Sequence, residues 1–139
     1  MREATGNNDG AEVERYLMTV GLGKGYAWCA AFVHWALSAC GVPNNITAWS
    51  PTAHNAKNVV YHRGMLHKDI KAADVFTIYS NGKKRISHTG FVHKYTGNGY
   101  YVSVEGNTNS GGSHDGDGVY RRIRSLSNTY SITRWIKEN

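Results

Sequence analysis

The chain has 139 residues, a length that suits one domain, and we expect residues 1–139 to form a single domain. Its hydrophobic share of 40% and aromatic share of 12% are those of a folded globular protein and exclude a disordered chain. The formal net charge of +6 favours an anionic partner such as nucleic acid, a membrane surface or an acidic wall polymer, and it serves solubility equally well.

The basic residues are dispersed along the chain, and only Arg121, Arg122 and Arg124 lie close together. No RNA-binding or helix-turn-helix pattern accompanies them, so nucleic-acid binding is not the favoured interpretation. No apolar run approaches the roughly 18 residues that a membrane-spanning helix needs. Residues 1–6 are polar, so we expect no signal peptide in this chain, and the sequence leaves the export route open.

Helical patterns occupy the first half of the chain. Apolar residues recur at helical spacing after Asp9, which predicts a helix that ends at Gly21. A second helix is predicted from about residue 27 to residue 40, because Gly41 follows it as a stop signal. We expect both helices to pack one apolar face against the remainder of the domain.

A third, short helix is predicted to start at Ser50 and Pro51 and to turn Val60 towards the core. Strand patterns fill the second half of the chain, and Gly97-Asn98-Gly99 predicts a hairpin there. Helices followed by an antiparallel sheet of about five strands predict an α+β domain. The expected strands are residues 75–79, 86–95, 100–105, 119–124 and 130–136.

The two cysteines, Cys29 and Cys40, lie at opposite ends of the second predicted helix, about 16 Å apart along its axis. A disulfide needs Cα atoms within about 7 Å, so both are predicted to be free thiols. The first turn of a helix favours a thiolate and the last turn disfavours one. Cys29 is therefore the candidate nucleophile, and Cys40 is predicted to be a buried residue that iodoacetamide labels more slowly. On this evidence alone, an inert buried thiol remains the better interpretation of Cys29.

A base for this thiol must come from the seven histidines. His88 and His93 lie on one predicted strand but face opposite sides of it. His88 stands beside the small Gly90, which gives it a modest lead, and activity is expected to rise through its titration near neutrality. No HExxH or CxxC spacing and no glycine-rich phosphate loop is present, so neither a zinc site nor a nucleotide cofactor is predicted.

Three segments, in this order, resemble the CHAP-type amidases and endopeptidases of the wider NlpC/P60 papain-like group. Residues 25–33 (GYAWCAAFV) are similar to the nucleophile helix of that family, and residues 86–92 (ISHTGFV) to its histidine strand. Residues 104–109 (VEGNTN) are similar to the next strand, which carries a third polar residue, and the likeness spans about residues 6–136.

The resemblance implies a papain-like α+β domain that cleaves an amide bond in peptidoglycan without a cofactor. It implies Cys29 as the nucleophile and His88 as the general base. The bond is left open between the N-acetylmuramoyl-L-alanine linkage and a linkage in the stem peptide or cross-bridge. The place of action would be the periplasm or the extracellular cell wall.

Two departures from the family pattern bear on the site. Many CHAP enzymes carry Gln or Asn directly before the cysteine, where this chain has Trp28, which we expect to be a core residue. The backbone N–H of Cys29 and the hydroxyl of Tyr26 are candidate replacements as donors to the oxyanion. Some members bind calcium through an Asp-rich loop ahead of the cysteine, but Asp9 and Glu12 are too sparse for such a loop, so no metal is predicted.

Glu105 and Asn107 are both candidates for the residue that orients His88. If Tyr95 pairs with Tyr100 across a four-residue turn, Asn107 lies opposite His88 and Glu105 lies diagonal to it, on the same face. A two-residue turn or a bulge would shift this register by one residue. Glu105 is preferred, because a carboxylate stabilises the imidazolium, and Asn107 is expected to be a supporting polar group.

Four residues near the candidate site are expected to line a groove for a stem peptide: Tyr26, Trp49, Ser50 and Tyr79. The main alternative is a catalytically inactive peptidoglycan-binding module of the same fold. A basic nucleic-acid-binding protein, whose affinity for DNA would fall steeply with salt, is the third interpretation. The sequence does not indicate whether a cognate immunity or inhibitor protein exists.

Overall fold

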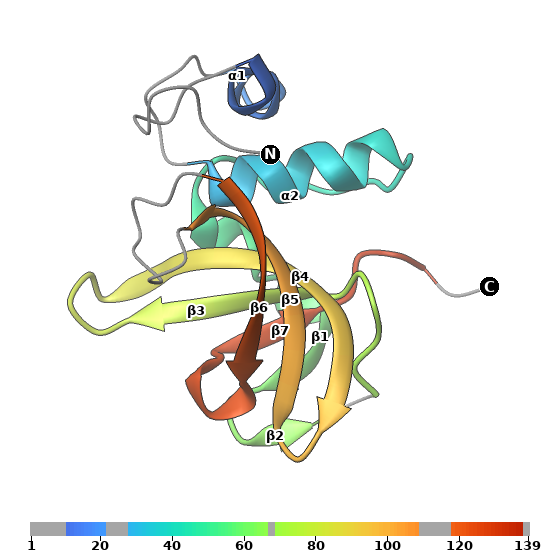
Figure 1. The fold of residues 1–139 in the computed structure, drawn as a ribbon, viewed down its shortest axis with the longest axis vertical. Helices are drawn as coiled ribbons and strands as arrows, with labels where there is room; N and C mark the ends of the chain where they lie inside the picture. Colours follow the sequence, from blue (N-terminus) through green and yellow to red (C-terminus); the bar gives the residue numbers. More distant parts are fainter. Residues whose placement is uncertain (1–10, 22–27, 67–68, 109–117, 138–139) are drawn as a thin grey trace.

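The computed structural model describes residues 11–21, 28–66, 69–108 and 118–137. Two helices, α1 (Ala11–Met18) and α2 (Cys29–Ala39), lie together on one side of a strongly twisted sheet (Figure 1). Three 3-10 turns, η1 (Ser50–Ala53), η2 (Ala56–Asn58) and η3 (Leu126–Asn128), connect other elements. The predicted α+β class, with N-terminal helices on an antiparallel sheet, is confirmed.

The sheet has seven strands in the order β2-β1-β7-β3-β4-β5-β6, and the neighbouring strands run antiparallel. The five predicted strands correspond to β3 to β7, while β1 and β2 form an additional short hairpin. The strands are β1 (Val59–His62), β2 (Met65–Leu66), β3 (Val75–Ser80), β4 (Arg85–Gly97), β5 (Tyr100–Thr108), β6 (Gly118–Ser125) and β7 (Ser131–Thr133).

The short helix predicted to start at Ser50 and Pro51 does begin there, as the 3-10 turn η1, but it ends at Ala53 and does not extend to Val60. Only the turns η1 and η2 form there, and Val60 lies in β1. His54 and Asn55 between the turns have extended backbone, and the Asn55 side chain accepts a hydrogen bond from the Lys57 N–H at 3.0 Å. Such local side-chain bonds compete with helical ones, so the helix cannot propagate beyond a single turn.

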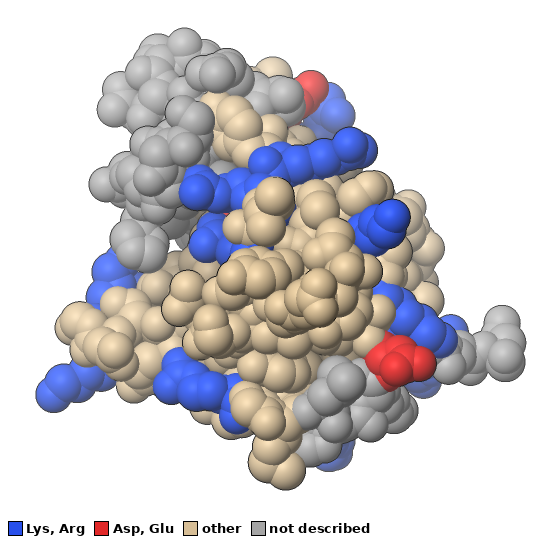
Figure 2. Space-filling model, turned by 60° about the horizontal axis from the view of Figure 1, so that its bottom comes forward, with Lys and Arg blue, Asp and Glu red and all other residues tan. Residues whose placement is uncertain are grey.

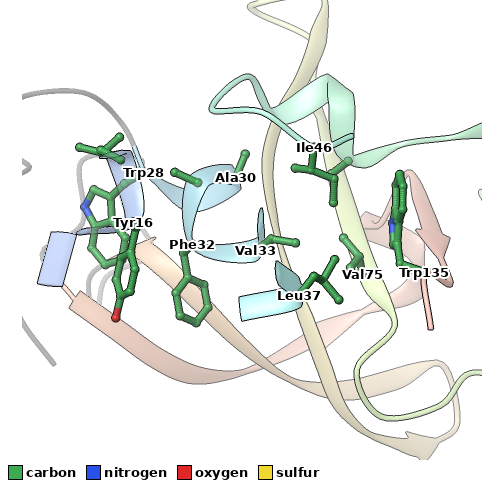
Figure 3. Close-up of a cluster of buried hydrophobic side chains, with 12 residues drawn as sticks. Tyr16, Trp28, Ala30, Phe32, Val33, Leu37, Ile46, Val75 and Trp135 are labelled. Atoms are coloured by element: carbon green, nitrogen blue, oxygen red, sulfur yellow. The ribbon is translucent and has the colours of Figure 1, made fainter. Parts of the chain in front are cut away.

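The core between the helices and the sheet is built around α2, whose inner side chains point at the strands (Figure 3). Trp28, directly before α2, is fully buried in this core, as predicted. The side chains of Val75 and Phe76, adjacent on β3, belong to two different buried clusters, so both faces of the sheet are covered. The second cluster contains both Tyr101 of β5 and Ile132 of β7, although β3 and β4 lie between these strands in the sheet.

The two ends of α2 differ in their surroundings. Gly41, with φ of +73°, follows the last turn and ends the helix as predicted. Both cysteines are free thiols, but Cys40 is exposed, so its prediction as a core residue is wrong. Cys40 is the C-cap residue, three positions beyond Leu37, which is the last buried side chain of the helix.

Candidate active site

Cys29 is the first residue of α2, and its side chain is 4% exposed. Its Sγ atom lies 3.3 Å from the Oγ atom of Ser50 in η1, and it also contacts the backbone of Thr89 in β4. Trp28 at the N-cap position has no side-chain acceptor for the free N–H groups of the first turn. Cys29 therefore lies in the first turn, at the positive end of the helix dipole.

His88 lies on β4, close enough to Cys29 for the imidazole and the thiol to shift the pKa of one another. On its other side, Nε2 lies 2.8 Å from Oε1 of Glu105. An ionised carboxylate can only accept hydrogen bonds, so Nε2 carries a proton and donates a hydrogen bond to Glu105. Nδ1 is then the ring nitrogen left to interact with the thiol. The structure thus brings Cys29, His88 and Glu105 into one buried row.

The register of the β4–β5 hairpin explains how Glu105 reaches His88. Near the site the register is the one predicted, since Phe91 pairs with Val104. The predicted pairing of Tyr95 with Tyr100 is wrong, because Asn98 and Gly99 alone form the turn, both with positive φ as a tight hairpin turn requires. Two irregularities between the turn and the site restore the expected register.

Glu105 has no exposed surface and accepts four hydrogen bonds from three side chains. Besides His88, Ser103 donates from Oγ to Oε2 at 2.5 Å. Arg124 of β6 donates from Nε to Oε2 at 2.9 Å and from Nη2 to Oε1. A Cβ atom at Gly90 would lie 2.7 Å from the Glu105 Cβ atom, so the carboxylate has room only because residue 90 is glycine.

The charges of this row stabilise one another. Burial alone would raise the pKa of Cys29, but the hydrogen bond and charge of His88, with help from Ser50 and Thr89, lower it overall. Burial alone would lower the pKa of His88, whereas its contacts with Cys29 and Glu105 raise it to about 9. The expectation that His88 titrates near neutrality is therefore wrong, and the row favours a thiolate beside an imidazolium.

The pKa of Glu105 is lowered to about 2 although burial opposes its ionisation. The hydrogen bonds from Arg124 and His88 account for this shift. In the sequence, Arg124 stands out only as part of a basic cluster, and no local pattern predicts its contact with Glu105. The register of β6 on β5, which pairs Arg124 with Tyr101, brings it there.

The remaining predicted site residues are placed as follows. Ser50 is buried against the Cys29 thiol, and the neighbouring Trp49 is 57% exposed. Tyr79 is partly exposed on β3 and stacks on Tyr130 with ring centroids 5.6 Å apart. Tyr26 and the side chain of Asn107 lie outside the described residues, so their predicted roles stay predictions.

Around Tyr79 the structure gathers aromatic and basic side chains that the sequence reasoning did not connect. The guanidinium of Arg63 lies over the rings of Tyr79 and Tyr130, at 5.9 and 5.4 Å from their centroids. His54 and His62 both pack edge-on against Tyr130. This group is connected to the candidate site along the chain. Tyr79 directly follows Ile78, which pairs with His88, and His54 lies four residues after Ser50, which contacts Cys29.

Among the described residues, no cluster of three or more His, Cys, Asp or Glu side chains is arranged to hold a metal ion. In the same part of the chain, no helix is both long and apolar enough to cross a membrane.

The fold and the row define an α+β domain in which an imidazole lies between a thiol and a carboxylate, a set of groups suited to attack on a carbonyl carbon. The family model described as CHAP domain matches residues 21–107, which is more than half of the chain, and the protein belongs to this family. CHAP domains are hydrolases that act on peptidoglycan in the extracellular or periplasmic cell wall. Neither a curated protein nor a solved structure shows significant similarity to the chain.

Proposed function

We propose that this protein is a cysteine amidase or endopeptidase that hydrolyses an amide bond in peptidoglycan, with Cys29 as the nucleophile. The observation that carries the proposal is the contact between Cys29 and His88, whose pKa values are shifted in opposite directions, towards a thiolate and an imidazolium. A thiolate is the reactive form of cysteine, and an imidazolium is the acid that an amine leaving group needs.

In the proposed reaction, the Cys29 thiolate attacks the amide carbonyl carbon, and the carbonyl oxygen becomes an oxyanion. The backbone N–H of Cys29, at the start of α2, is available to stabilise that oxyanion. The C–N bond then breaks while the imidazolium of His88 gives its proton to the departing amine, which leaves a thioester. A water molecule next gives a proton to the neutral His88 and attacks the thioester, which releases the acid and regenerates the thiolate.

Glu105 holds the imidazole in position and stabilises its charged form, and Asn107 is proposed as an additional polar support. For substrate binding we retain Tyr26, Trp49 and Tyr79. Ser50 keeps that proposed role too, although its hydroxyl is buried against the thiol and is also suited to orient the nucleophile.

The proposed substrate is the stem peptide of the wall, and the reaction would take place in the periplasm or the extracellular wall. Lys and Arg side chains are scattered over the face seen in Figure 2 and do not form one concentrated patch. Such a distribution favours a loose attraction to an acidic polymer over a defined binding site for one anionic group. We treat residues 1–139 as one catalytic domain.

Dye release from purified sacculi tests the proposal, with Cys29→Ala as the inactivating variant and Cys40→Ala as its matched control. Wild type and Cys40→Ala should release dye, whereas Cys29→Ala should not, with its unfolding curve nearly unchanged. Mass spectrometry of the released muropeptides then identifies the bond. Dye release by Cys29→Ala would refute the nucleophile, and wild type that binds sacculi without releasing dye would identify an inactive binding module.

A further inference from the structure

We infer that Arg124 is a positioning residue of this site, which holds Glu105 as an anion with its Oε1 atom directed at His88. The inference rests on the proposed function for its catalytic meaning, but its physical basis is the set of contacts within β4, β5 and β6. Arg124 lies beyond residues 21–107, the segment that the family model matches.

The first step of the argument is the isolation of Glu105. Its side chain has no exposed surface, so water cannot solvate a charge there. An ionised carboxylate in such a place must be compensated by charge and by hydrogen bonds, or it takes up a proton. Ser103 supplies a neutral donor, and His88 supplies a cation only while it is protonated.

The second step is the geometry of Arg124. Its guanidinium donates to both oxygens of Glu105, from Nε to Oε2 and from Nη2 to Oε1. A bidentate pair of this kind fixes the carboxylate plane as well as its charge. With Oε2 also held by Ser103, Oε1 is the oxygen that meets Nε2 of His88.

The third step is that Arg124 is itself held in place. Its guanidinium carbon lies 5.6 Å from the centroid of the Phe76 ring, and Phe76 is fully buried. The same ring lies 6.0 Å from the imidazole of His88. Because Arg124 remains charged at every pH of interest, it supports the Glu105 anion even when His88 is neutral, which happens once in each proposed catalytic cycle.

The inference is tested with Arg124→Gln and Arg124→Lys in the full chain. Arg121→Gln is the matched control, because Arg121 is exposed on the same strand and its loss changes the net charge equally. The titration of the Glu105 carboxyl carbon, followed by carbon-13 NMR, is the direct readout and needs no turnover. We expect its midpoint to rise by about two pH units or more in Arg124→Gln, less in Arg124→Lys, and not at all in Arg121→Gln.

Lysis of sacculi gives the second readout. Arg124→Gln should lose at least about tenfold in rate, the acidic limb of its pH profile should move upward, and Arg124→Lys should recover part of both. A folded Arg124→Gln whose Glu105 titration and acidic limb stay in place would overturn the inference. If wild type shows no lysis, the proposed function fails, whereas the carboxyl titration still decides the role of Arg124.

Arg124→Gln leaves a buried carboxylate without its cation and can fail to fold for that reason alone. The double variant Glu105→Gln/Arg124→Gln removes both charges and keeps the question open to measurement. If Arg124 acts only through Glu105, the double variant should lyse sacculi within about twofold of Glu105→Gln. A further tenfold loss on adding Arg124→Gln to Glu105→Gln would show an independent role and would contradict the inference.

Discussion

In the described part of the chain, two buried carboxylates are each paired with a partly buried arginine, in similar geometry and different surroundings. Arg124 holds Glu105 beside His88, and Arg134 donates from Nε and Nη2 to the two oxygens of Asp74, at 2.9 Å each. Asp74 is buried like Glu105 but also accepts the backbone N–H of Lys71 at 2.8 Å. One carboxylate contacts a titratable side chain, and the other ties a chain segment to the sheet.

The contrast teaches that the pair itself does not identify a functional site. A bidentate arginine and a buried carboxylate fix local structure in both places. The second partner of the carboxylate decides whether the pair also controls a protonation state. That partner is the imidazole of His88 for Glu105 and a backbone N–H for Asp74. Five predictions, from the largest expected effect to the smallest, test this distinction.

Neutralising each carboxylate should give opposite outcomes. Glu105→Gln should lower the rate of sacculus lysis by about 100-fold, because an amide does not stabilise the imidazolium of His88. Asp74→Asn should leave that rate within about twofold while lowering the free energy of unfolding by about 3 kcal/mol, the cost of breaking a buried pair. Rates and urea unfolding curves of both variants supply the test. Equal rate losses would show that the two pairs do not differ in function.

The pH profile should separate the pairs in a second way. Activity on a soluble stem peptide should fall as pH rises through about 9, where His88 loses its proton. Glu105→Gln should move this basic limb down by about one pH unit or more, because the imidazolium loses its anion. Asp74→Asn should leave it in place. A basic limb that shifts equally in both variants would contradict the contact-based explanation.

The stability of the wild-type protein should follow the same shifts. His88, raised from 6.5 to about 9, contributes stability fully below about pH 6.5, and this is lost as pH rises through about 9. Glu105, lowered from 4.5 to about 2, contributes fully above about pH 4.5 and loses its contribution as pH falls through about 2. Urea unfolding across this range should show both losses in wild type and neither of these two in Glu105→Gln/His88→Ala.

A glycine should be required at position 90, beside Glu105, and not at position 82. In Gly90→Ala the new Cβ atom would meet the Glu105 Cβ atom at 2.7 Å and the Phe76 ring at 2.8 Å. Such overpacking should cost about 1–3 kcal/mol of stability and displace the carboxylate, with a severalfold loss of lysis. Gly82→Ala is the control, since the nearest atom there is the Ser80 Oγ atom at 3.8 Å. A Gly90→Ala protein as stable and active as Gly82→Ala would show that the strand gives way at no cost.

The smallest effects are expected at Cys40, at the opposite end of α2 from Cys29. Cys40→Ser should lyse sacculi at the wild-type rate, and the labelling of Cys40 by iodoacetamide should be the same in Glu105→Gln and Asp74→Asn. Labelling of Cys29 should slow in Glu105→Gln alone, because its thiolate depends on the His88 charge. Cys40 is exposed, so only the lowered pKa of Cys29, and not burial of Cys40, still supports the prediction that iodoacetamide labels Cys29 faster. Peptide mass spectrometry measures both sites, and a change at Cys40 would point to a general loosening of the fold.

Local patterns in the sequence predict much of the fold. Helix periodicity and the stop at Gly41 located α2, and alternating apolar residues located the strands from β3 onward. The helix that starts at Ser50 is shorter than predicted, because the Lys57 N–H donates to the Asn55 side chain, a local bond that periodicity does not detect. The predicted burial of Cys40 is wrong because the apolar face of a helix is buried only where another element packs against it, and in α2 this ends at Leu37.

For the candidate site, the sequence brought Cys29, His88 and Glu105 together, in part through compensating errors. The hairpin turn is two residues shorter than assumed, and two strand irregularities cancel the difference before His88 is reached. Arg124 could not be foreseen, because it lies 19 positions from Glu105 and meets it only through the register of β6. No spacing rule in a single sequence reports which arginine of a basic cluster turns inward.

The complete burial of Glu105 limits which groups of the site can exchange protons with water or substrate. Gly90 on the neighbouring strand and Gly106 beside it bring Phe76 and Trp28 so close that no side-chain atom could be added at either position without a clash. Bulk water therefore cannot reach the carboxylate directly, and Glu105 cannot activate the water that resolves a thioester. Of the carboxylate and the imidazole, only His88, with its 6% exposure, is open to exchange protons with the substrate side. The proton given to the amine and the proton taken from water would then pass through the same ring.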